Sequence, residues 1–191
     1  MSSGSAVITP LDPPRQPGAN WNPHIGEEAQ ELVTRKLAHE SDEARAAVLS
    51  SAASILSKSV DPQSGTGSET GLVVGYVQSG KTLSFTTVMA LARDNGFQLV
   101  IVVAGTSKLL LKQSTDRLRK DLQIEEIEGS LRWKLYTNPA DNENTRRHIQ
   151  QTFGEWSDPL VPPSERATVL ITVMKNHGWL RRLVGLLGHL D

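Results

Sequence analysis

The chain of 191 residues contains no cysteine. This absence excludes disulfide bonds, metal sites built on thiolates and enzymes with a cysteine nucleophile. The chain also lacks an apolar run long enough to cross a bilayer. Its first residues have neither a basic segment nor an apolar core, so we expect no signal peptide. These absences predict a cytoplasmic protein with no membrane partner.

Two further types of site are missing from the sequence. The histidines do not have the spacing of a metal site with a third ligand nearby. Ser79 lacks the first glycine of a nucleophile elbow, which argues against a serine hydrolase. The net charge of −1 says little as a total, but the part from residue 71 onward is mildly basic. That excess permits contact with nucleic acid without requiring it.

The stretch from residue 71 to residue 82 has the clearest chemical signal. Its apolar run at 72–74 predicts a buried strand, and a loop with glycine at both ends follows. A helix is expected to begin at Lys81. Gly75, four further residues, and then Gly80, Lys81 and Thr82 match the phosphate-binding loop of nucleoside triphosphatases.

Each residue type in this loop has a chemical reason. Successive backbone N–H groups and the positive end of the following helix bind phosphate oxygens, and glycine permits the turns they need. Lys81 is the expected catalytic cation at the β- and γ-phosphates, and the Thr82 hydroxyl is the expected Mg²⁺ ligand. We therefore expect ATP and Mg²⁺ as cofactors. The expected nucleotide-binding residues are Gly75, Gln78, Ser79, Gly80, Lys81 and Thr82.

The remaining pattern predicts an α/β fold of the three-layer, helicase-type phosphate-loop class, with a mainly parallel sheet and an N-terminal helical extension. The expected domains are a flexible arm at 1–26, the helical extension at 27–60, a linker at 61–70 and the ATPase domain at 71–191. Strands are expected at 72–74, 99–104, 131–136 and 168–173, and helices at 27–39, 41–58, 107–122, 144–153 and 178–190, besides the one that opens at Lys81.

Three details of this pattern can be tested by the structure. Residues 72–104 have the length of a strand, helix and strand crossover unit. The run at 99–104 is typical of a strand buried on both faces. Within the intervening helix, the side chains expected on one buried face are Phe85, Val88, Met89 and Ala92. In the proline-rich arm, Trp21 either docks on the folded chain or covers the base of the nucleotide.

A group of basic side chains is expected on one face of the helix at 107–122. Lys108, Lys112 and Arg119 fall near one face of this helix. Leu111, Leu118 and Leu122 fall near another face. These three side chains either contact nucleic-acid phosphates or form an ordinary solvated face.

Taken together, these motifs resemble the N-terminal, helicase-type region of the Z-one domain family of endonuclease-like proteins. That resemblance is based on the Val-Gln-Ser-Gly-Lys-Thr loop and on four later segments, and it covers roughly residues 70–190. The later segments are 94–96, 104–106, 113–118 and 171–176. It implies an ATP-hydrolysing, DNA-acting superfamily 2 protein of restriction or phage defence.

One part of the family pattern is missing. Such ATPases have an acidic motif on the next strand, and the chain ends at Asp191, where that strand is expected. We therefore expect an ATP-binding segment that is truncated before this motif and lacks the second helicase domain and the endonuclease-like domain. Alone, it should hydrolyse ATP at close to the uncatalysed rate, unless Glu125, Glu126 or Glu128 supplies the carboxylate. A small nucleotide or metabolite kinase and a nucleotide-binding regulatory fragment without turnover are the alternatives.

Overall fold

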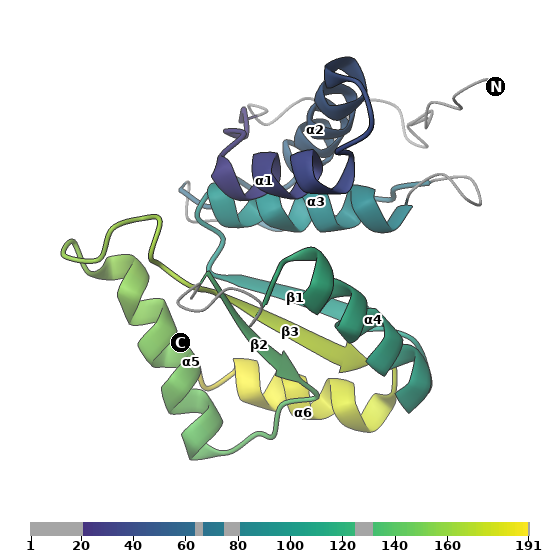
Figure 1. Cartoon of the computed structure of the whole chain (residues 1–191). Helices are drawn as coiled ribbons and strands as arrows, with labels where there is room; N and C mark the ends of the chain where they lie inside the picture. The colour runs from purple at the N-terminus through teal and green to yellow at the C-terminus, as the bar shows by residue number, and fades with distance from the viewer. Residues whose placement is uncertain (1–20, 64–66, 75–80, 125–131, 191) are drawn as a thin grey trace. The chain divides into compact units, whose positions relative to one another are not determined.

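The computed structural model describes residues 21–63, 67–74, 81–124 and 132–190. The chain divides into two compact units, residues 1–96 and 97–191. The first unit contains helices, and the second contains a sheet with helices on it (Figure 1). This division lies at residue 96, whereas we expected a domain boundary at residue 71. The assignment of residues 71–191 to an ATPase domain stays a prediction.

The first unit contains α1 (Glu27–Lys36), α2 (Asp42–Leu56) and α3 (Lys81–Asp94). All three helices were expected, and α3 packs against both of the others. Ser41 caps α2 by accepting a hydrogen bond from the Ala44 N–H at 3.3 Å. The fully or almost fully buried apolar side chains of this unit include Ala29, Leu32, Val33, Ala52, Ala90 and Leu91.

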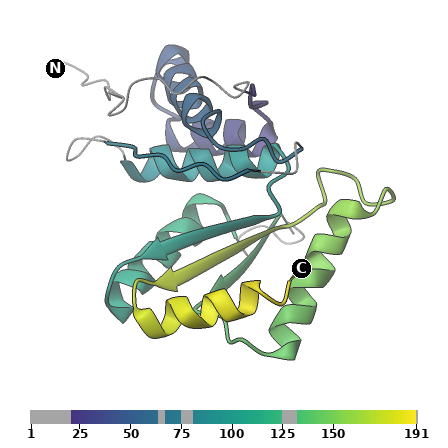
Figure 2. The ribbon, with the colours of Figure 1, turned by 180° about the vertical axis from the view of Figure 1, so that it is seen from behind.

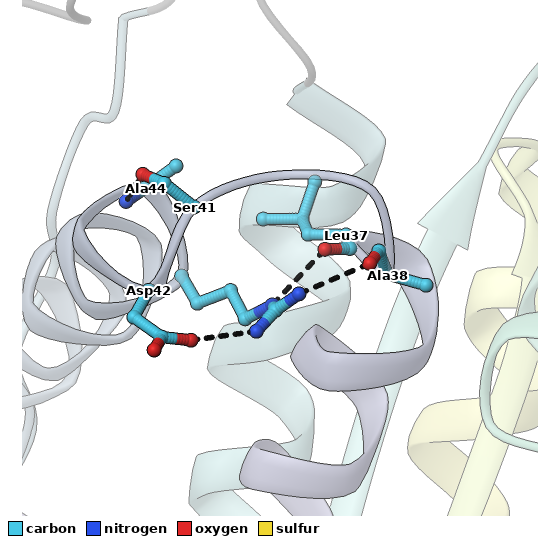
Figure 3. A network of polar contacts seen from close by, with 6 residues as sticks. Leu37, Ala38, Ser41, Asp42 and Ala44 are labelled. Carbon is cyan, nitrogen blue, oxygen red and sulfur yellow. Dashed lines mark hydrogen bonds and ion pairs between the residues drawn. The ribbon is translucent and has the colours of Figure 1, made fainter.

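Arg45 joins the end of α1 to the start of α2 through hydrogen bonds to Leu37, Ala38 and Asp42, which are labelled in Figure 3. Its guanidinium donates to the carbonyl oxygens of Leu37 at 3.0 Å and Ala38 at 3.1 Å. It also donates to the Asp42 carboxylate at 2.7 Å. A positive group at the C-terminal end of a helix satisfies carbonyls that have no partner within the helix. The single guanidinium therefore fixes the turn between the two helices.

The buried surface of α3 is broader than the sequence pattern indicated. Met89 and Ala92 are buried as expected, but Phe85 is exposed. Thr86 and Thr87 are fully buried, and each hydroxyl donates to a carbonyl one turn earlier at 2.8 Å. Because α3 contacts two helices, residues beyond a single apolar stripe are covered. A buried threonine is tolerated here because its hydroxyl has a partner within the helix.

The expected strand at 72–74 is wrong. Leu72, Val73 and Val74 form no strand and are 69%, 53% and 57% exposed. The crossover unit expected over 72–104 is therefore not formed by the described residues. An apolar run of three residues has strand propensity, but a strand is stabilised by pairing and burial, and propensity alone does not supply them.

The second unit contains a parallel three-stranded sheet in the order β1-β3-β2. Its strands are β1 (Leu99–Ala104), β2 (Trp133–Thr137) and β3 (Thr168–Met174). Leu99 lies opposite Val169, and Trp133 lies opposite Thr168. The expectation of an α/β fold with a parallel sheet is confirmed for these residues. The finer assignment to a phosphate-loop fold stays a prediction.

The last strand in the chain occupies the centre of the sheet. All seven residues of β3 are buried, as expected from its β-branched sequence. β1 was also expected to be buried on both faces, and this is wrong: four of its residues are partly exposed and Val103 is 49% exposed. Within the described part of the chain β1 pairs only with β3, so it is an edge strand there.

Helices cover both faces of this sheet (Figures 1 and 2). On one face, α4 (Lys108–Asp121) places Leu111 against Ala104 and Met174. On the other face, α5 (Glu143–Ser157) and α6 (His177–Leu187) pack on alternate residues of β3. That cluster consists of Ile149, Val169, Ile171, Val173, Leu183 and Leu186. The helices expected at 107–122, 144–153 and 178–190 are thus confirmed, with ends that differ by a few residues.

Candidate nucleotide and nucleic-acid sites

Most of the predicted phosphate loop lies outside the described residues. Gly75, Gln78, Ser79 and Gly80 belong to the segment 75–80, so their predicted roles are not tested. The described chain resumes at Lys81, whose backbone begins α3. The predicted loop is thus followed directly by a helix start, as the sequence indicated.

Thr82, the predicted Mg²⁺ ligand, is the second residue of α3 and is half-buried. Its carbonyl oxygen accepts a hydrogen bond from the Thr86 hydroxyl at 2.8 Å. This bond adds a side-chain contact to the first turn of the helix. The N–H groups of a first helical turn have no partner within the helix and can bind an anion.

The three basic residues predicted to contact nucleic acid all lie on α4, but their surroundings differ. Ser107 begins the helix by accepting from the Leu110 N–H at 3.2 Å. Lys108 and Lys112 are exposed, and Lys112 forms an ion pair with Asp116 at 2.5 Å. Arg119 is half-buried. Lys108 and Lys112 are therefore the two that present charge to solvent.

The carboxyl ends of the three strands are tied together by backbone features that the sequence analysis did not identify. Gly105 and Asn138 follow β1 and β2 with φ of 40° and 45°. The Lys175 N–H, just after β3, donates to the Gly105 carbonyl at 2.8 Å. The Asn138 side chain accepts from the Met174 N–H at 3.0 Å. The only signal for this arrangement was the presence of glycine and asparagine after the strands, the residue types that tolerate left-handed backbone.

A chain of three threonine hydroxyls crosses the α4 face of the sheet. Thr115 of α4 donates to Thr172 of β3 at 3.0 Å, and Thr172 donates to Thr137 of β2 at 3.1 Å. Thr115 and Thr172 are buried, whereas Thr137 at the end of β2 is exposed. The polar groups are satisfied by one another, which is why they are tolerated in the core. Each threonine was unremarkable in sequence because the three belong to elements far apart in the chain.

The turn Asp94-Asn95-Gly96 has a second role besides ending α3. The helix-ending turn is confirmed: the Gly96 N–H donates to the Arg93 carbonyl at 3.0 Å, and Gly96 has a φ of 91°. In addition, the Asp94 carboxylate accepts from the N–H groups of Glu28 at 3.1 Å and Ala29 at 3.0 Å. A residue at the end of α3 therefore caps the beginning of α1.

The electrostatics of this cap are set mainly by burial. Loss of solvent raises the pKa of the Asp94 carboxyl above its ordinary value, and the Glu28 carboxylate adds to the rise. The two backbone hydrogen bonds and the Arg93 guanidinium oppose it. Gly26 makes the close approach possible, because a Cβ there would lie 2.6 Å from the Asp94 Cγ. In the sequence, the signal for this contact is a glycine directly before an acidic first turn.

Four further features of the chain concern the candidate carboxylates, metal binding, membrane spans and Trp21. Glu125, Glu126 and Glu128 lie outside the described residues. Over the ranges that the structure describes, no group of three or more histidine, aspartate or glutamate side chains could hold a metal ion. No described helix is long and apolar enough to span a membrane. Trp21 docks on the first unit, where its indole N–H donates to the Ser59 carbonyl at 3.0 Å.

Comparison with known proteins gives no family for this chain. No family model, no curated protein and no solved structure matches it. The resemblance to the Z-one domain family therefore depends on the residues quoted above.

Proposed function

We propose that this chain is the ATP-binding segment of a DNA-acting, superfamily 2 helicase-like protein of the Z-one domain endonuclease-like family. One observation supports the proposal most: the sequence Gly75 to Thr82 has the spacing of a phosphate-binding loop, and α3 begins at Lys81 within it. A helix that begins at the lysine directs its first N–H groups toward the loop, as phosphate binding requires. The parallel α/β unit that follows is consistent with this class of fold.

The nucleotide part of the proposal has a direct test in calorimetry with ATP·Mg. Lys81→Ala should remove about 2–5 kcal/mol of binding free energy, because it deletes a charge that pairs with a phosphate. Lys58→Ala is the matched control, since Lys58 is an exposed lysine of the same unit outside the loop. Equal affinity of the parent and Lys81→Ala proteins would refute the assignment.

The metal role of Thr82 can be separated from its place in the helix. Thr82→Ser keeps the hydroxyl and should retain Mg²⁺-dependent binding, whereas Thr82→Ala should weaken it. In the absence of Mg²⁺ the two variants should bind ATP alike. If the ATP affinities of Thr82→Ser and Thr82→Ala differ by the same factor with and without Mg²⁺, the hydroxyl is not a metal ligand.

The DNA part of the proposal depends on the exposed charge of α4. Lys108→Ala with Lys112→Ala should weaken binding of single-stranded DNA and reduce its dependence on salt. Two lost phosphate contacts lower the slope of log K against log salt concentration by about 1.4. The charge-matched control is Arg117→Ala with Lys120→Ala on the same helix, both exposed. Equal losses for the two double variants would mean that no particular face of α4 binds DNA.

A further inference from the structure

Residues 21–26 form a segment without helix or strand that we call the strap. Side-chain hydrogen bonds hold it at two points near the ends of α2 and α3, and the Gln30 side chain of α1 also donates to the Ile25 carbonyl at 3.0 Å. Near its start, the Trp21 indole N–H donates to the Ser59 carbonyl, just after α2. Three residues later, the strap is bound by the side chain of Asn95 at the end of α3.

Asn95 binds the backbone of the strap rather than a side chain. Its amide oxygen accepts from the His24 N–H at 2.7 Å, and its amide nitrogen donates to the His24 carbonyl at 2.8 Å. The second amide hydrogen has its own partner, the Leu91 carbonyl at 2.7 Å. The amide is therefore oriented by α3 and presents one acceptor and one donor to the strap. Such two-point pairing fixes an extended backbone, as a neighbouring strand would.

The strap and α1 are held by different kinds of interaction. α1 is anchored by Ala29, Leu32 and Val33, which are at most 2% exposed. In the strap Pro23 and Gly26 are buried and Trp21 and Ile25 are half-buried, whereas Asn22 and His24 are exposed, so the strap is less completely buried than the core face of α1. Regions with few buried apolar contacts open locally without global unfolding. Gly26, where the strap joins α1, is the N-cap of that helix and has an extended backbone.

From this contrast we propose that the strap is a latch on α3, which opens and closes as one unit while α1, α2 and α3 stay folded. The Trp21 contact and the Asn95 contact then belong to one cooperative event. Removal of the Asn95 contact should then weaken the Trp21 contact. Because coupling between two sites is reciprocal, removal of the Trp21 contact should weaken the Asn95 contact by the same factor. The Asp94 cap of α1 lies beyond Gly26 and stays closed during this event.

Hydrogen exchange measured by NMR on the full chain tests the latch. In Asn95→Ala, exchange of the Trp21 indole N–H should accelerate about tenfold, because two hydrogen bonds of modest net strength are lost from the same unit. In Trp21→Phe, exchange of the His24 N–H should accelerate by a similar factor. Asn22→Ala is the matched control, since Asn22 is exposed within the strap and should change neither rate.

The amides of Glu28 and Ala29 show whether the strap opens alone. Because Asp94 binds them, their exchange should change by less than about twofold in both variants. An unchanged Trp21 indole rate in Asn95→Ala would overturn the latch, because the two contacts would then be independent. Equal acceleration at Trp21, Glu28 and Ala29 would also overturn it, because the strap would then open only together with α1.

Discussion

Replacement of Asp94 by asparagine tests how the first unit is held together. Both carboxylate oxygens are in use: Oδ1 accepts from the Glu28 N–H and Oδ2 from the Ala29 N–H. An asparagine can accept at only one of these positions, and its NH₂ group then faces a second donor. Ala29 is fully buried, so its N–H would be left without a partner. A buried donor that loses its partner costs about 1–3 kcal/mol, and we expect a loss near the middle of that range.

The dependence on pH gives this prediction its sharpest form. Burial raises the folded-state pKa of Asp94 above the unfolded value, which is close to 3.8. A raised pKa means that the contribution of Asp94 to stability is fully present below the unfolded pKa and is lost as the pH rises through the folded pKa. The difference in the free energy of unfolding between the parent and Asp94→Asn should therefore be larger at pH 3 than at pH 7.

Native-state hydrogen exchange of the Leu32 and Val33 amides measures this difference, because both residues lie in the core of the first unit. Asp42→Asn is the matched control: its carboxylate is 91% exposed and pairs with Arg45 at the surface. That pair should contribute less than about 1 kcal/mol. The opposite result would be a loss of unfolding free energy in Asp94→Asn that becomes smaller as the pH falls. Asp94 would then stabilise α1 as an anion, and burial would not be the dominant effect on its pKa.

Three further substitutions test other features of the fold by urea unfolding. Gly105→Ala should destabilise the second unit by about 2–4 kcal/mol, because φ is 40° there and the new Cβ would lie 2.4 Å from the Leu110 Cβ; a loss below about 0.5 kcal/mol would contradict that contact. Thr172→Val should cost about 1–2 kcal/mol by interrupting the hydroxyl chain from Thr115 to Thr137; no loss would mean that the hydroxyls contribute nothing net. Arg45→Lys should cost about 1–2 kcal/mol, because a lysine cannot reproduce the fork that binds two carbonyls and a carboxylate; equal stability would show that charge alone suffices.

The sequence predicted the strands and helices of the second unit because their signals are local. β3 is a run of seven residues rich in β-branched side chains, and α4 has leucines at helical spacing behind a serine cap. Such patterns report burial and backbone preference directly. The same kind of signal failed at 72–74, where the apolar run is short and exposed. It also failed to show that β1 would lie at an edge, because strand order depends on how distant segments pair.

The contacts between distant segments of the chain were harder to predict. Asp94 capping α1, Asn95 binding His24 and the threonine chain all join residues far apart in sequence. A single sequence contains no direct record of such pairs. The sequence predicted that the basic side chains of α4 share a face of the helix. It did not predict that Arg119 is half-buried, because that depends on how the helix packs on the sheet. The predicted phosphate loop is defined by spacing alone and stays a prediction.

The central proposal, that ATP·Mg is bound by the loop from Gly75 to Thr82, has one most direct test. Backbone amide NMR shifts of the full chain can be followed as ATP·Mg is added. We predict that the largest saturable changes fall on the amides of Gly80, Lys81 and Thr82, since these N–H groups would bind phosphate oxygens. Lys81→Ala should abolish these changes while the shifts of α1 and β3 stay as in the parent. Saturable changes confined to other parts of the chain, or none at millimolar nucleotide, would contradict the proposal.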